Sequence, residues 1–210
     1  MPPLNSESVT KVIGAVLAAG AASRFGRPKQ LAKFGTRTLI DIAIDALDTA
    51  AVDEACIVLG CNFELIDSHL SKRSTDAGAL QTLFNSDWQR GLSTSIRCAT
   101  EFAIDRHATH LLLLTCDQPF VNAELVTTLL KNLSLNSVVA CKYGDTTGIP
   151  AVFPKNLFEE LLQLEGDRGA KSVIQKHVAG FVAFPDGVHD IDHPADLAMH
   201  SVLTSQFIEQ

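Results

Sequence analysis

The sequence predicts a single α/β domain with a Rossmann-like, doubly wound arrangement around a mostly parallel central sheet. The first observation is that short apolar runs, typical of buried strands, alternate with segments in which apolar residues recur at helical spacing. The second is the length of these strand–helix–strand units, which favours a parallel sheet covered by helices on both faces. The third is size, because 210 residues with 46% hydrophobic content fit one large domain with a full core.

The first half of the chain carries the most regular part of this pattern. Residues 12–19 form an apolar run that ends at Gly20, which predicts a buried strand entering a loop over residues 20–30. Apolar residues then recur at helical spacing after Thr38, a residue that can cap a helix. Further strands are predicted at 55–59, 80–84 and 111–115, and further helices at 63–70, 93–104 and 123–133.

The regular alternation of predicted strands and helices ends at residue 137. Two short strands are expected at 137–141 and 149–153, separated by Gly144 and Gly148. Helices are expected at 157–164 and 170–177, a final strand at 181–184, and a C-terminal helix after the segment 190–196. No repeat or linker is visible in the sequence, so we expect residues 1–10 to be a flexible N-terminal segment and residues 11–210 to form one domain.

Composition and charge disfavour several functional classes. The formal net charge of −7 disfavours a non-specific nucleic-acid binder, which needs a basic surface. No apolar stretch approaches the roughly 18 residues that span a bilayer, and the polar start of the chain lacks the apolar core of a signal peptide. The five cysteines are odd in number and show no CxxC spacing, which suits a reducing compartment. We therefore expect a cytoplasmic protein without a nucleic-acid or membrane partner.

A glycine-rich loop with basic residues follows the first predicted strand, at the sheet edge where open α/β folds bind ligands. Small residues let backbone N–H groups approach a phosphate closely, and Arg24 and Lys29 can add positive charge. Two common phosphate-binding patterns are absent, because Gly26 is not followed by Lys and Ser or Thr, and GxGxxG lacks a glycine. From composition alone, two interpretations of this loop remain open: a phosphate-binding loop, or a turn that is basic for solubility.

The loop resembles the signature LAAGxSxRxGxPKxL of the MobA-like NTP transferases. The positions that fit are Leu17, Ala18, Ala19, Gly20, Arg24, Gly26, Pro28, Lys29 and Leu31. Ser23 stands one place later than the serine of the signature, and Phe25 replaces the commoner methionine. Within this family the whole chain most resembles the molybdenum cofactor cytidylyltransferases.

The resemblance implies a fold of the nucleotide-diphospho-sugar transferase type and a nucleotide site. The loop of such enzymes wraps the phosphates of an NTP, which implies roles in nucleotide binding for Leu17, Ala18, Ala19, Gly20, Arg24, Gly26 and Lys29. The doublet Ala18-Ala19 matches the form associated with CTP, because guanylyl-transferring relatives usually carry glycine in place of Ala19.

Two aspartates are candidates for metal binding. Asp117 comes directly after the most apolar predicted strand, where its carboxylate would face the same crevice as the loop. Taken alone it could equally be a turn or helix-capping residue, but the Asp117-Gln118-Pro119 triplet resembles the metal-binding motif of the family. The segment 190–197 resembles the family sequence DIDTPEDL, and Asp192 matches the aspartate that supplies a second carboxylate to magnesium. Asp190 and Asp196 are interpreted as turn and helix-start residues.

Weaker matches concern the nucleobase and the acceptor. The segment 85–95 resembles NxxWxxGLxxS, which implies that backbone amides of Gly91, Leu92 and Ser93 lie beside the base, with Trp88 in a packing role. The segments 148–153 and 166–171 also match the family and are expected on the acceptor side. They depart from the family pattern at Ile149 and Lys171. The expected acceptor-binding residues are Gly148, Pro150, Gly166, Asp167 and Lys171.

These matches together predict a magnesium-dependent nucleotidyltransferase. Arg24, Lys29 and Asp117 are the expected catalytic residues, and Asp117 and Asp192 the expected ligands of Mg²⁺. The resemblance implies transfer of CMP from CTP, or of another nucleotide from its NTP, to molybdopterin, and possible delivery of the product to a molybdoenzyme. Two alternatives remain open: a different phosphorylated acceptor, such as a sugar or alditol phosphate, and a non-catalytic carrier of the molybdenum cofactor.

Overall fold

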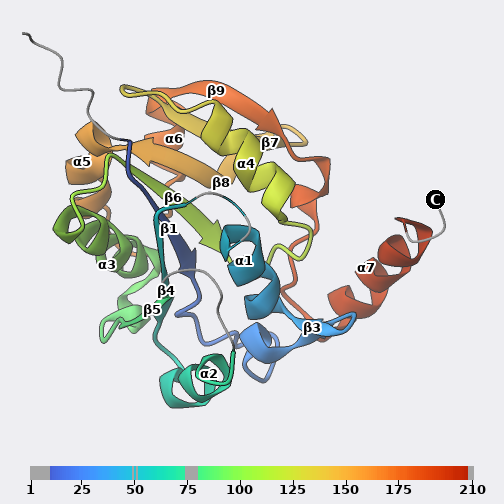
Figure 1. Ribbon diagram of the computed structural model, residues 1–210. Coiled ribbons are helices and arrows are strands. Elements are labelled where there is room, and N and C mark those ends of the chain that lie inside the picture. Colours follow the sequence, from blue (N-terminus) through green and yellow to red (C-terminus); the bar gives the residue numbers. More distant parts are fainter. Residues whose placement is uncertain (1–9, 49, 51, 74–79, 208–210) are drawn as a thin grey trace, which may run out of the picture.

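A seven-stranded sheet forms the centre of the computed structural model, which describes residues 10–48, 50, 52–73 and 80–207 (Figure 1). Its spatial order is β5-β4-β1-β6-β8-β7-β9. The strands are β1 (Val12–Leu17), β4 (Glu54–Leu59), β5 (Gln81–Phe84), β6 (His110–Thr115), β7 (Val138–Tyr143), β8 (Thr146–Pro154) and β9 (Val178–Ala183). From β1 the chain adds β4 and β5 on one side, and it then returns to add β6, β8, β7 and β9 on the other side. The change in winding direction therefore lies between β1 and β6, at the centre of the sheet.

All strands of this sheet run parallel except β8, which pairs antiparallel with both β6 and β7. The turn between β7 and β8 uses Gly144, whose φ of 55° suits glycine. Gly148, expected between the two strands, lies inside β8 instead. The structure therefore confirms a mostly parallel sheet but extends the second strand of this hairpin toward its turn.

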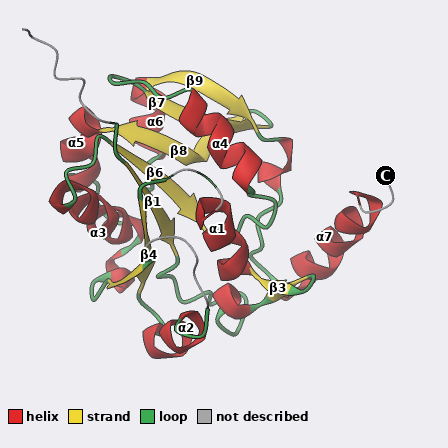
Figure 2. Cartoon of the chain, viewed as in Figure 1, coloured by secondary structure: helices red, strands yellow, loops and turns green. Residues whose placement is uncertain are grey.

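Helices cover both faces of the sheet, as a doubly wound fold requires (Figure 2). One face packs against α1 (Leu39–Asp48), α2 (Phe63–Leu70) and α4 (Ala123–Lys131). The other packs against α3 (Leu92–Asp105), α5 (Phe158–Leu162) and α6 (Lys171–His177). Side chains of β1 alternate between the two cores, Val16 toward the first and Leu17 toward the second. This arrangement confirms the predicted fold class.

A third, smaller core lies beside the loop that follows β1. It contains Phe25, Phe34 and the buried Ile191. Phe34 lies in β2 (Lys33–Phe34), which pairs antiparallel with β3 (Arg37–Thr38). Four 3₁₀ helices complete the described structure: η1 (Lys29–Leu31), η2 (Trp88–Arg90), η3 (Lys155–Leu157) and η4 (Pro185–Val188). Because this cluster contains both Phe25 and Ile191, the loop after β1 packs against the segment that precedes α7 (Pro194–Phe207). In Figure 1, α7 extends away from the body of the domain.

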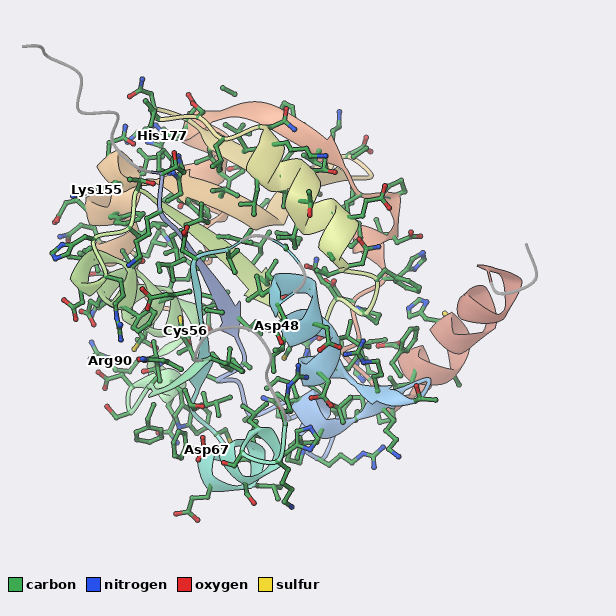
Figure 3. The ribbon with its side chains drawn as sticks, viewed as in Figure 1. Asp48, Cys56, Asp67, Arg90, Lys155 and His177 are labelled. Carbon is green, nitrogen blue, oxygen red and sulfur yellow. The ribbon has the colours of Figure 1, made fainter. Side chains whose placement is uncertain are left out.

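The predicted N-terminal segment lies almost wholly outside the described residues, which begin at residue 10. All five cysteines carry free thiols, and Cys56 is buried in β4 (Figure 3). Within the described part of the chain, no helix is long and apolar enough to cross a membrane.

Candidate active site

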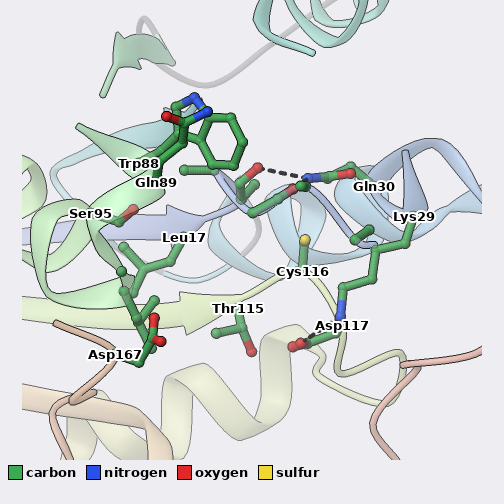
Figure 4. A pocket seen from close by; sticks show the side chains of 17 residues that line it. Leu17, Lys29, Gln30, Trp88, Gln89, Ser95, Thr115, Cys116, Asp117 and Asp167 are labelled. Atoms are coloured by element: carbon green, nitrogen blue, oxygen red, sulfur yellow. Dashed lines mark hydrogen bonds and ion pairs between the residues drawn. The ribbon is translucent and has the colours of Figure 1, made fainter. Parts of the chain in front are cut away.

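A cavity of about 390 Å³ opens at the carboxyl ends of β1 and β6, where the winding of the sheet changes direction (Figure 4). It is lined by three segments that lie far apart in the sequence. These are the loop after β1, the turn and helix start around Trp88 to Ser95, and the end of β6 with Asp117. Asp167 completes the wall. Most residues expected at the nucleotide site are therefore gathered around one cavity.

The backbone of the loop after β1 presents its amides to this cavity. The buried side chain of Gln30 donates two hydrogen bonds, to the carbonyl oxygens of Ala18 (2.8 Å) and Gly20 (2.9 Å). The carbonyl of Ala19 accepts from the backbone N–H of Cys61 at 2.9 Å. Among the described residues, the N–H groups of Gly20, Ala21 and Ala22 have no acceptor. A loop with fixed carbonyls and free N–H groups is an anion-binding arrangement.

Lys29 brings the two candidate metal-binding carboxylates together. Its Nζ donates to Asp117 Oδ2 at 3.0 Å, to the backbone oxygen of Ile191 at 3.1 Å and to Asp192 Oδ1 at 3.2 Å. Burial alone would lower the pKa of Lys29, but Asp117, with smaller contributions from Cys116 and Asp192, raises it overall. Lys29 therefore remains a cation held by three oxygen atoms of two separate segments.

Arg24 lies at the outer edge of this cluster. Its guanidinium faces Asp192 Oδ2 at 3.5 Å, and its side chain is 70% exposed. Such an exposed contact contributes little to stability, which leaves the guanidinium available to a ligand. Arg24 and Gly26 do not line the described cavity.

The segment that carries Asp192 is anchored at both ends. The N–H of Ile191 donates to the backbone oxygen of Asp117 at 2.8 Å. The N–H groups of Asp192 and His193 both donate to Asp196 Oδ2, at 2.9 and 2.7 Å, and these bonds lower the pKa of Asp196. Asp196 thus holds the turn that presents Asp192, consistent with its interpretation as a helix-start residue.

Asp190 adds a further carboxyl group next to this cluster. Asp190 is an exposed residue, yet desolvation of its carboxyl group and the nearby Asp117 raise its pKa to about 6. A hydrogen bond from Gln118 and the charge of Lys29 act in the opposite direction. The concentration of carboxylates here favours a bound cation over an anion.

The oxygen atoms around Lys29 also fit a divalent metal. Asp117 Oδ2 and Asp192 Oδ1 both accept a hydrogen bond from Lys29 Nζ, so the two carboxylates face the same point. Magnesium prefers oxygen ligands and commonly takes one or two carboxylates together with substrate phosphates. In the described part of the chain, no cluster of three His, Cys, Asp or Glu side chains could hold a metal, so substrate oxygens would have to complete the site.

The opposite wall of the cavity is formed by Trp88, Gln89, Gly91, Leu92 and Ser95. Ser93, expected to contribute its amide, is buried instead, and its N–H donates to the backbone oxygen of Gly166 at 3.1 Å. Gly91 approaches the same segment so closely that a Cβ atom would lie 2.4 Å from the carbonyl carbon of Gly166. This packing places Asp167 on the same cavity as the loop after β1, although we expected it on the acceptor side.

The other expected acceptor residues do not line the described cavity. Gly148 is buried in β8, where a Cβ atom would lie 2.2 Å from the hydroxyl oxygen of Tyr143. Pro150 is buried in the same strand after a cis peptide bond, and Lys171 is exposed at the start of α6. Of the expected acceptor residues, Asp167 alone lines the described cavity, and Gly148, Pro150, Gly166 and Lys171 lie outside its lining.

Several residues at the cavity were not anticipated from the sequence, among them Gln30, Ser95 and Cys116. Gln30 stands beside Lys29 in the loop signature, and this position could have indicated that it lies near the site. Its hydrogen bonds to two backbone carbonyls depend on the folded loop. Ser95 matches the last position of NxxWxxGLxxS. Burial raises the pKa of the Cys116 thiol to about 12, so this thiol stays neutral beside Asp117.

Comparison with known proteins places the chain in a family. The family model described as "MobA-like NTP transferase domain" matches residues 14–180. A probable molybdenum cofactor guanylyltransferase of Geobacillus sp. (strain WCH70) is 26% identical over 165 residues, covering 76% of this chain and 80% of that protein. Nicotine blue oxidoreductase of Paenarthrobacter nicotinovorans is also 26% identical, over 174 residues, covering 79% and 82%.

A solved structure is similar to this chain in fold. The crystal structure of Rv0371c from Mycobacterium tuberculosis H37Rv in complex with manganese has a TM-score of 0.68 and 25% sequence identity, covering 90% of this chain and 97% of that one. Since the family match spans most of the chain, the protein belongs to the MobA-like NTP transferases and is a nucleotidyltransferase of that type.

Proposed function

We propose that the protein transfers CMP from CTP to molybdopterin and releases pyrophosphate. The observation that carries this proposal is the meeting of Lys29 with Asp117 and Asp192 beside the free amides of the loop after β1. The cavity is lined by the loop after β1, the Lys29 cation and Asp117, and Asp192 joins them through its contact with Lys29. Transfer of a nucleotidyl group needs this combination, because a polyanionic substrate must be positioned and its charge compensated.

The preference for CTP rests on the doublet Ala18-Ala19. Guanylyl-transferring relatives usually carry glycine at the second position, whereas here Ala19 is buried beside the cavity. Its carbonyl is also fixed by the N–H of Cys61. Ala19 adds a methyl group to the lining of the cavity, and this supports a preference for the smaller pyrimidine base over guanine.

The reaction is an in-line displacement at phosphorus. A phosphate oxygen of the acceptor forms a bond to the α-phosphorus of CTP, while the bond from that phosphorus to the bridging oxygen breaks and pyrophosphate leaves with the electron pair. The acceptor phosphate is already ionised, so no general base is required. The loop amides and Lys29 bind the phosphates, and Arg24 offsets the charge that develops on the leaving pyrophosphate.

We assign the metal site to Asp117 and Asp192. Bound there, Mg²⁺ would supply charge compensation at the phosphates. The fit is supported by the three oxygens that already hold the Lys29 cation, because the same donor set suits a hard divalent ion. The acceptor could also be a sugar or alditol phosphate, since the expected acceptor residues do not gather at one place in the described structure.

Removal of either carboxylate tests this assignment. In Asp117→Asn and Asp192→Asn, we expect a higher magnesium concentration for half-maximal activity and lower turnover, measured as pyrophosphate release from CTP with molybdopterin. The double variant should be little worse than the worse single variant, because the two residues act as one unit. Asp105→Asn, at the exposed end of α3, is the matched control. An unchanged magnesium requirement in both single variants would remove these residues from the metal site.

A further inference from the structure

Asn85 is a buried amide at the end of β5, just outside the cavity, with a relative exposure of 2%. Its Nδ2 donates to Thr94 Oγ1 at 2.8 Å and to Ser95 Oγ at 3.1 Å. Its Oδ1 accepts from the backbone N–H of Asp87 at 3.0 Å. Both amide hydrogens and the amide oxygen are therefore engaged, which fixes the orientation of the group.

These bonds hold the turn that forms one wall of the cavity. Thr94 Oγ1 accepts from Asn85, and it lies 2.9 Å from the backbone oxygen of Gly91 and 3.2 Å from that of Asp87, to which it can donate. The backbone N–H of Asn85 donates to Leu59 at the end of β4, at 2.8 Å. The turn is thus tied to the first turn of α3 and, through Asn85, to the sheet.

Ser95 gains a specific orientation from the same network. Its Oγ accepts the hydrogen bond from Asn85, while no group in the described part of the chain accepts its hydroxyl proton. Ser95 also lines the cavity together with Gly91 and Leu92. A hydroxyl group that already accepts from a fixed donor is left to donate, so Ser95 presents an O–H donor toward the cavity.

We propose that Asn85 is a positioning residue for recognition of the nucleobase. It holds the turn at Asp87 to Gly91 and keeps Ser95 as a donor toward an acceptor atom of the base, a carbonyl oxygen or an unprotonated ring nitrogen. The inference rests on the proposed binding of a nucleotide in this cavity. Asn85 itself has no contact with the triphosphate end, where Lys29 and the loop after β1 lie.

The variant Asn85→Asp tests the inference, because it keeps size and the acceptor for Asp87 but removes both donated hydrogen bonds. The hydroxyl groups of Thr94 and Ser95 then turn to donate to the carboxylate, and Ser95 is lost as a donor to the base. Calorimetric titration with CTP should show affinity falling about tenfold, the equivalent of about 1.4 kcal/mol. Inorganic tripolyphosphate, which has no base, should bind the variant with an affinity within about twofold of its affinity for the wild-type protein.

Two further variants separate this role from a loss of structure or an effect of charge. Ser95→Ala removes the donor but leaves the turn in place, and it should weaken CTP without affecting tripolyphosphate. Asn122→Asp makes the same chemical change at the cap of α4, away from the cavity, and should leave both affinities unchanged. Equal weakening of both ligands in Asn85→Asp, or of neither, would overturn the inference. A wild-type protein that fails to bind CTP would instead contradict the proposed function.

Discussion

Lys29 connects the parts of the site at the scale of a single residue. Lys29→Ala removes a charge that should interact more strongly with the transition state than with the ground state. We expect turnover to fall by ~10²–10³-fold, as for other single electrostatic stabilisers. Without nucleotide, the same variant should bind Mn²⁺ more tightly than wild type, because the ammonium that occupies the carboxylate oxygens is gone. Turnover assays and calorimetry measure the two effects.

Lys33→Ala provides the control, since Lys33 is exposed in β2 a few residues further along the chain. It should leave turnover and Mn²⁺ binding unchanged. Near-normal turnover in Lys29→Ala would show that the interaction with Asp117 and Asp192 is structural only.

Single residues also show where sequence reasoning reaches its limit. Lys29, Asp117 and Asp192 could be identified because each follows a strand or stands in a spaced motif, and the structure brings them together. Gln30 could not be assigned its contacts, because its two acceptors belong to a loop whose path depends on packing. The place of Asp167 depends on the tight approach of Gly91 to Gly166, a contact between segments about 75 residues apart.

At the scale of elements, α1 is joined to α2 by a network around Asp41. The carboxylate of Asp41 accepts from Thr38, from Arg73 at 2.9 Å and from His69 at 3.0 Å, with a side-chain exposure of 17%. These partners outweigh the effect of burial and lower the pKa of Asp41. Thr38 in turn accepts from the N–H of Asp41 at 3.2 Å and caps α1, as the sequence predicted.

Loss of the Asp41 carboxylate should therefore destabilise the protein in a pH-dependent way. We expect Asp41→Asn to reduce the free energy of unfolding at pH 7 by about 1.5–3 kcal/mol, the range for hydrogen bonds to charged groups. Because its folded pKa is lowered, the wild-type carboxylate stabilises fully above the unfolded value of ~3.9 and loses this effect as pH falls through the folded value. Urea denaturation should show the difference between variant and wild type shrinking toward pH 3.

Asp67→Asn on α2 is the matched control, because its carboxylate has no ion-pair partner among the described residues (Figure 3). It should change stability little at either pH. A difference between Asp41→Asn and wild type that stays constant from pH 7 to pH 3 would show that the Asp41 charge is not the source of the stabilisation.

Helices and strands were predicted well where apolar residues recur at regular spacing, and less well where strand pairing determines the structure. The helix at 63–70 and the capped helix after Thr38 follow directly from spacing. Gly148 was placed between strands because glycine commonly marks a turn, yet it belongs to β8, where Tyr143 leaves no room for a side chain. The antiparallel direction of β8 could not be predicted, because burial on both faces gives parallel and antiparallel strands similar sequences.

At the scale of the whole molecule, the sheet edge at β1 and β6 determines where the chemistry lies. The loop after β1, the segment from Trp88 to Ser95 and the Asp117 segment all line the cavity there, although they are widely separated in the sequence. Family membership alone does not define the substrates, since one relative is named a guanylyltransferase and another an oxidoreductase at the same identity. The groups in the cavity are what favour nucleotidyl transfer.

We propose that this cavity catalyses transfer of CMP to molybdopterin. This can be measured by following the label from α-³²P-labelled NTPs, supplied one at a time with magnesium, with and without molybdopterin. We expect that CTP is used in preference to GTP, ATP and UTP, that the label appears on the molybdopterin product, and that one pyrophosphate is released for each label transferred. No label transfer from any NTP, or preferential transfer from GTP, would contradict it.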